Sequence, residues 1–195
     1  MKNVLFIVIL LNYLPLYAQT DSVQLDSKFH FKNGIYSSNL EVLNNNPKYP
    51  DYFLETRRGS EVIFGGSAYN FYNKLSNKQP YTDSLFAFVD NGVLLVYYKR
   101  DFHKLILTGA ISTFFTENTI QYSTNYATIE DHLYFLDLET GNIDKLKPEK
   151  IDSIIKRDSQ FYTDYSSISY SDKKKILYSY VLKYNKRNPI YIKLE

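Results

Sequence analysis

The sequence predicts an α+β fold: a mostly antiparallel, twisted sheet or partly closed barrel, with a short N-terminal helix and two C-terminal helices packed against it. Two observations predict the layers. Runs rich in β-branched and aromatic residues recur over residues 84–146 and are separated by turn signals. After Pro148 the apolar residues change to a helical spacing. A third observation concerns stability. The 195 residues contain no Cys, so no disulfide can form and we expect an ordinary hydrophobic core.

The start of the chain has the layout of a secretory signal peptide. A single cation precedes an apolar run over residues 4–11, and small or neutral residues follow it. A retained membrane anchor needs about 20 continuous apolar residues, whereas Asn12 and Pro15 interrupt this run. We therefore expect a signal peptide over residues 1–18 and a single domain over residues 19–195. No transmembrane segment is expected once the signal is removed.

The first element of the domain is a short helix with a clear start. Ser38 followed three residues later by Glu41 is a capping box, and the NNNP sequence at 44–47 ends the helix. Residues 48–79 contain only short apolar pieces between Gly, Asn and Lys clusters, so their strand order is not predicted.

The centre of the predicted sheet is a hairpin over residues 84–98. Two β-rich runs flank Asn91-Gly92, a pair that supplies the two positive φ angles of a type I′ turn. Both arms are apolar on successive residues, so we expect both faces of the hairpin to be covered.

Further strands are expected at 102–107 and 110–116, with TENT at 116–119 leading into the next one. In that next strand alternate residues share one face: Ile120, Tyr122, Thr124, Tyr126 and Thr128. Another hairpin with a Gly-containing loop follows at 133–146.

Two helices are expected in the C-terminal part. The first starts at Pro148 and buries an isoleucine stripe. The second starts after Ser171 or Asp172 and ends at Asn188-Pro189, and the IYIKLE sequence then forms a closing edge strand.

The second helix is expected to be mostly buried, with a narrow polar ridge. On a helical wheel Lys175, Lys183 and Lys186 fall in one wedge, while Tyr178 and Leu182 widen the apolar arc on the other side. The lysines are therefore interpreted as a solvated ridge rather than as a polyanion-binding surface.

Composition excludes some partners. The formal net charge of +2 gives no overall electrostatic bias toward nucleic acid, so no nucleic-acid partner is expected. The 20 Tyr and 13 Phe are typical of half-buried strands. Two functional interpretations of this Tyr content stay open, a glycan-binding surface and an adaptor whose exposed Tyr-rich face docks on a partner.

Catalytic motifs are weak. The three histidines lie far apart in the sequence, without the spacing of metal ligands. Asp101 with His103, and Asp131 with His132, are the catalytic candidates if the fold brings them together. The chain has no GxSxG elbow and no Gly-rich phosphate loop, so no cofactor is predicted.

One turn has the oxygen-bearing side chains that Ca²⁺ prefers, although it lacks the EF-hand pattern. Such residues also occur in ordinary turns, so no metal is predicted. The weak Ca²⁺ candidates are Asp137, Glu139, Asn142 and Asp144.

The motifs taken together carry a resemblance. Their order is FKNGIY, NNNP, DNGVLLVYY, FHKLILTGAISTF, YFLDLETGNI and YNKRNPIY. This order resembles a family of uncharacterised exported proteins common in Bacteroidetes, over most of the chain after the leader. The resemblance implies a Gram-negative envelope location, either periplasmic or at the cell surface, and it carries no activity.

These observations favour a non-catalytic exported protein that binds an envelope component or a protein partner. The alternative is an exported hydrolase that acts on glycan or lipid through carboxylate and His residues assembled by the fold. Convergence of the four catalytic candidates in one concave pocket would favour the hydrolase.

Overall fold

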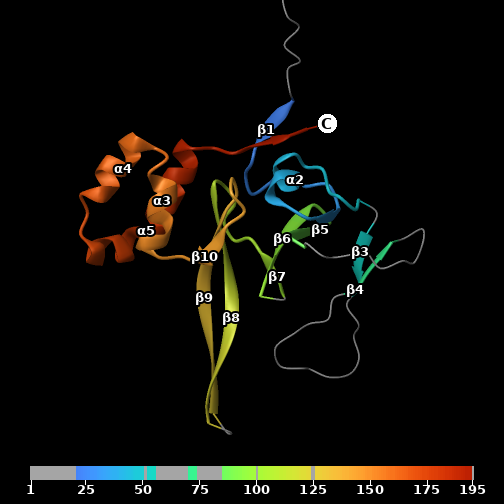
Figure 1. The fold of residues 1–195 in the computed structure, drawn as a ribbon, viewed down its shortest axis with the longest axis horizontal. Coiled ribbons are helices and arrows are strands. Elements are labelled where there is room, and N and C mark those ends of the chain that lie inside the picture. The colour runs from blue at the N-terminus through green and yellow to red at the C-terminus, as the bar shows by residue number, and fades with distance from the viewer. Residues whose placement is uncertain are drawn as a thin grey trace, which may run out of the picture.

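The computed structural model describes residues 21–50, 52–55, 70–73, 85–99, 101–123 and 126–194. Every pair of named strands is antiparallel. Helices α3, α4 and α5 gather on one side, and helix α2 lies with short strands on the other (Figure 1). The predicted α+β class and its antiparallel pairing are therefore confirmed. The described strands form separate ladders and no closed barrel.

The predicted central hairpin is confirmed. It belongs to a four-stranded sheet of order β2-β5-β6-β7. The strands are β2 (Gly34–Tyr36), β5 (Ala87–Asp90), β6 (Val93–Tyr98) and β7 (Asp101–Lys104). Asn91 has φ 50° and Gly92 has φ 77°, the two positive values of the expected turn. Strand β5 is buried on both faces up to Asp90, because Ala87 and Val89 pack in one core cluster and Phe88 in a second.

A longer hairpin projects from the body of the molecule (Figure 1). Strand β8 (Ile111–Ser123) pairs with β9 (Tyr126–Asp137), and β10 (Ile143–Lys145) pairs with the end of β9. The expectation of one strand from Ile120 to Thr128 was wrong, because the chain reverses where Ser123 pairs with Tyr126. Residues with high strand propensity flank this reversal, so alternation alone did not reveal it.

The two ends of the described chain meet. Strand β1 (Ser22–Gln24) pairs with β11 (Tyr191–Lys193), so the closing edge strand is confirmed. Strands β3 (Tyr52–Glu55) and β4 (Asn70–Asn73) form a separate ladder in the segment whose order was not predicted.

The capped N-terminal helix is confirmed as α2 (Asn39–Leu43). The Ser38 hydroxyl accepts a hydrogen bond from the Glu41 backbone N–H at 3.3 Å. The Glu41 carboxylate in turn accepts from the Ser37 N–H at 2.7 Å. These bonds satisfy backbone donors that a helix start leaves without intrahelical partners.

The C-terminal part contains three helices rather than the two expected. They are α3 (Pro148–Ile155), α4 (Ser159–Ser166) and α5 (Tyr170–Arg187). Helix α4 was missed because its large apolar residues are all aromatic, a class that favours strands. Its start is nevertheless capped, since the Asp158 carboxylate accepts from the Phe161 N–H at 3.0 Å.

Helix α5 begins at Tyr170, earlier than expected, and Ser169 caps it. The lysine ridge is confirmed, because Lys175, Lys183 and Lys186 are exposed. The expectation that this helix is mostly buried was wrong. Its buried residues are Leu177, Val181 and Tyr184, while Tyr178 and Leu182 are 41% and 44% exposed.

The reason is the position of helix α4. Phe161 and Tyr165 of α4 both contact the ring of Tyr180, with centroids 5.6 and 5.2 Å apart. The buried side of α5 is thereby drawn toward Tyr180 and away from Leu182.

One core cluster joins the helices to the sheets. It takes buried residues from α2, β5, β6, β8, β9 and all three C-terminal helices. Within the described ranges, no helix is both long enough and apolar enough to cross a membrane.

Candidate functional site

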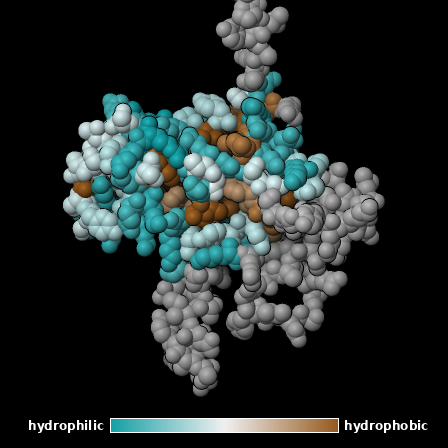
Figure 2. All heavy atoms as spheres, in the orientation of Figure 1, coloured by the Kyte–Doolittle hydropathy of each residue, from teal (hydrophilic) through white to brown (hydrophobic). Residues whose placement is uncertain are grey.

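A pocket of about 630 Å³ opens where four segments of the chain meet. The segments are the link after β1 (24–31), the start of β6 (92–94), the link from β7 to β8 (104–109) and the end of α5 with the residues after it (185–190). Figure 2 shows apolar residues gathered at the middle of one face, framed by hydrophilic ones. The volume falls in the range of about 300–1,000 Å³ typical of small-molecule sites.

The walls of the pocket are continuous with the hydrophobic core. Leu25, Phe31, Leu94 and Ile190 line it and are each less than a tenth exposed. Ile106 also lines it but is 49% exposed. The hollow therefore offers apolar surface that is open to a ligand.

Backbone hydrogen bonds fix the segments around the pocket. The Leu25 N–H donates to the Ile190 carbonyl at 2.8 Å, and the Phe31 N–H donates to the Gly92 carbonyl at 3.1 Å. The Ile106 N–H donates to the Thr113 carbonyl at 2.8 Å. Because the first two bonds join segments distant in sequence and the third fixes the link between β7 and β8, the pocket is formed before any ligand arrives.

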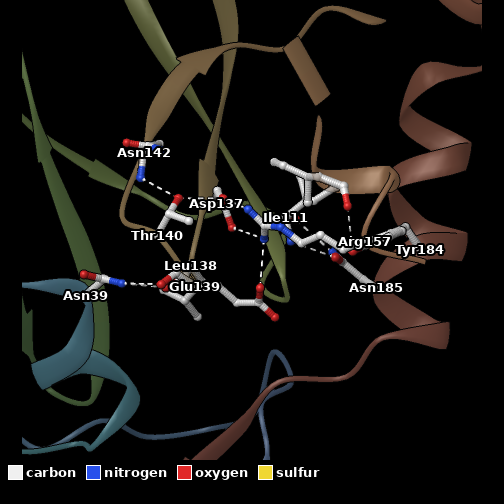
Figure 3. Close-up of polar contacts among 11 residues, drawn as sticks. Asn39, Ile111, Asp137, Leu138, Glu139, Thr140, Asn142, Arg157, Tyr184 and Asn185 are labelled. Carbon is white, nitrogen blue, oxygen red and sulfur yellow. Dashed lines mark hydrogen bonds and ion pairs between the residues drawn. The ribbon is translucent and has the colours of Figure 1, made fainter. Parts of the chain in front are cut away.

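Asn185 ties helix α5 to strand β8 beside the pocket. Its side chain accepts from the Ile111 N–H and donates to the Ile111 carbonyl, both at 2.8 Å (Figure 3). Gly109 allows this contact, since a Cβ at that position would lie 2.5 Å from the Asn185 amide nitrogen. A side chain at residue 109 is therefore incompatible with the observed position of Asn185.

Charged groups also line the pocket. Lys104 and Lys186 are exposed, and neither has an acidic partner in the described part of the chain. The Asp26 carboxylate accepts from the Lys28 N–H at 2.8 Å. The sequence does not predict this site, because Lys104 lies in a predicted strand and Lys186 in a predicted solvated ridge. The pairing of β1 with β11, which brings 24–31 close to 185–190, had no signal in the sequence.

A second polar site links the β9–β10 turn to the helices (Figure 3). The Arg157 guanidinium, in the link between α3 and α4, donates to Asp137 at 3.0 and 2.5 Å and to Glu139 at 2.8 Å. Thr140 donates to Asp137 at 2.6 Å. Burial opposes ionisation of Asp137, but the hydrogen bonds from Arg157 and Thr140 outweigh it and hold the pKa of Asp137 below its ordinary value.

The three acidic Ca²⁺ candidates contact cationic side chains of the protein. Asp137 and Glu139 share the guanidinium of Arg157. Asp144 pairs with Lys150 at 2.8 Å, and this contact lowers the pKa of Asp144. The backbone N–H of Asn142 donates to Thr140 at 3.3 Å. Among the described side chains, no three His, Asp or Glu residues are grouped so that they could hold a metal ion.

The catalytic candidates lie on two different hairpins. Asp101 and His103 are on β7, whereas Asp131 and His132 are on β9. The His103 ring stacks on Phe114, with centroids 5.2 Å apart, and its Nε2 is 3.1 Å from the Tyr98 carbonyl oxygen. Asp101, His103 and His132 do not line the pocket, and the side chain of Asp131 lies outside the described part of the structure.

The chain was compared with protein-family models, curated protein sequences and solved structures, and none of them matches it. The candidate sites are therefore interpreted from their own geometry.

Proposed function

We propose that the protein is a non-catalytic, exported binding protein that holds an apolar or amphipathic ligand in the pocket bounded by β6, the β7–β8 link and the end of α5. The location is proposed from the signal-peptide layout of residues 1–18. The observation that carries the binding function is a pre-formed pocket of about 630 Å³ whose apolar walls belong to the core.

The lining favours binding over hydrolysis. Hydrolysis by acid–base groups needs a base within hydrogen-bond reach of the reacting atom. Two possible bases among the described residues line the pocket, Asp26 and His30. The Asp26 carboxylate accepts from the Lys28 N–H, and these two side chains are not hydrogen-bonded to each other as an acid–base pair would be. Bound apolar groups gain about 25 cal/mol for each Å² of apolar surface removed from water, so the walls alone provide affinity.

The binding function is tested with N-phenylnaphthylamine, a neutral fluorophore whose emission rises in apolar surroundings. The purified protein is titrated with this probe beside two variants. Ile106→Trp fills the pocket, while Leu182→Trp adds the same side chain to an exposed site outside the pocket. Circular dichroism confirms that both variants fold.

We expect saturable probe binding to the wild type and to Leu182→Trp, and its loss in Ile106→Trp. Equal binding to both variants, or no saturable binding to the wild type, would contradict the proposed function.

A further inference from the structure

The charges that line the pocket are unbalanced. Lys104 comes from the end of β7 and Lys186 from the last turn of α5, so two lysines line the hollow from different elements. Neither is paired with an acid among the residues described. The described lining also contains the imidazole of His30 and the carboxylate of Asp26, which is a hydrogen-bond acceptor for a backbone N–H. An anionic group in the pocket would neutralise the excess positive charge.

We infer that the pocket binds a long-chain carboxylic acid, with its alkyl chain in the apolar hollow and its carboxylate held by Lys104 and Lys186. This inference rests on the proposed binding function and names the ligand class. The walls supply the apolar contact, and the two lysines supply the charge-assisted hydrogen bonds that a carboxylate accepts.

The surroundings of the lysines favour a carboxylate over a phosphate. Phosphates are typically held by arginine forks or by the N-terminus of a helix. Among the described residues, no arginine lines the pocket, and the helix end that reaches it is the C-terminus of α5. A helix C-terminus carries a partial negative charge, which repels a dianion more than a monoanion. The carboxylate of Asp26 acts in the same direction.

The apolar walls predict that affinity depends on chain length. Each buried methylene improves binding by about fourfold. A ligand whose alkyl chain lies against the buried lining residues Leu25, Phe31 and Leu94 gains this contribution for each methylene in contact with them. A short carboxylic acid would keep the charge contacts but lose most of the affinity, because exposed charge pairs are weak on their own.

Displacement of N-phenylnaphthylamine from the wild-type protein tests the ligand class. Four competitors are compared below their aggregation limits: hexadecanoate, tetradecanoate, hexadecanol and hexadecyl phosphate. We expect hexadecanoate to be the strongest. Tetradecanoate, which lacks two methylenes, is expected to be about fifteenfold weaker, and the neutral alcohol about tenfold weaker.

Two matched variants test the role of the lysines. Lys104→Gln combined with Lys186→Gln removes both charges at the pocket, while Lys174→Gln combined with Lys183→Gln removes two exposed charges that do not line it. We expect the first variant to bind the neutral probe normally and to lose the preference for hexadecanoate over hexadecanol. The second variant should keep that preference.

The possible outcomes separate this inference from the proposed function. Normal probe binding with equal displacement by acid and alcohol would overturn the carboxylate assignment and leave the binding function intact. Tighter binding of hexadecyl phosphate than of hexadecanoate would also overturn the carboxylate assignment and leave the binding function intact. Absence of probe binding to the wild type would contradict both proposals. A preference for the acid that survives loss of both pocket lysines would also overturn the assignment.

Discussion

Two groups of charged residues lie beside the C-terminal helices, one around Arg157 and one at the pocket. They differ in whether each charge has a partner of opposite sign. Around Arg157, each charged group contacts a partner of opposite sign, and the buried carboxylate of Asp137 is 3% exposed. At the pocket, Lys104 and Lys186 have no acidic partner among the described residues and face an open apolar hollow. The comparison indicates that the first region stabilises the fold and that the second is available to a ligand.

The largest expected effect is on the paired region. Arg157→Ala leaves the buried carboxylate of Asp137 without its cation, which costs about 3 kcal/mol in the free energy of unfolding. Lys175→Ala is the matched control. It breaks an exposed pair with Asp172, in which the side chains are 71% and 56% exposed, so its loss of stability should be much smaller than that of Arg157→Ala. Urea denaturation of both variants measures the difference, and similar losses would contradict a stabilising role for Arg157.

The second expected effect is at Asn185, which both stabilises the fold and lines the pocket. Asn185→Asp keeps the acceptor for the Ile111 N–H but loses the donor to the Ile111 carbonyl. The expected loss of stability is about 1–2 kcal/mol, because Ile111 is buried. The new charge also lines the pocket, so we expect weaker binding of hexadecanoate with little change for hexadecanol. Thermal denaturation and probe displacement measure the two effects, and weaker binding of both ligands alike would argue against an electrostatic cause.

The pH dependence of stability tests whether the ionised carboxylate of Asp137 stabilises the fold. The pKa of Asp137 is lowered in the folded protein, so its contribution is complete above the ordinary value of 3.8. It is lost as the pH falls from there through the folded pKa. We therefore expect Asp137→Asn to be less stable than the wild type at neutral pH. Denaturation at a series of pH values should show that the gap narrows in acid. A gap that stays constant would mean that ionisation of Asp137 does not contribute.

The smallest effect is expected at the exposed apolar residues of α5. Tyr178→Ala combined with Leu182→Ala removes side chains that are 41% and 44% exposed. Surface changes away from core or charge networks usually alter stability by no more than about 0.5 kcal/mol per residue. A loss of several kcal/mol on urea denaturation would show that these residues are buried as the helical wheel predicted.

Local signals in the sequence predicted local structure well. The capping residue Ser38, the turn pair Asn91-Gly92 and the helix stop at Pro189 act through their own backbone, so each was found at the expected place. The reversal after Ser123 was missed because the residues that flank it favour strands, and helix α4 was missed because its large apolar residues are aromatic.

The candidate site could not be predicted, because its parts are far apart in the sequence. Lys104 and Lys186 reach one pocket only because β1 pairs with β11 and Asn185 binds the backbone of Ile111. A charge pattern along the chain describes one helix face at a time, and it therefore assigned Lys186 to a solvated ridge. The position of Lys104 relative to that ridge is a property of the fold alone.

The most direct test of the account is nuclear magnetic resonance of the protein with ¹³C-labelled hexadecanoate. We predict contacts between the alkyl chain and the side chains of Leu25 and Ile106. We also predict a shift of the carboxylate carbon that disappears in the variant lacking the charges of Lys104 and Lys186. Contacts to Leu182 instead, or a carboxylate signal that is the same with and without the two lysines, would contradict the account.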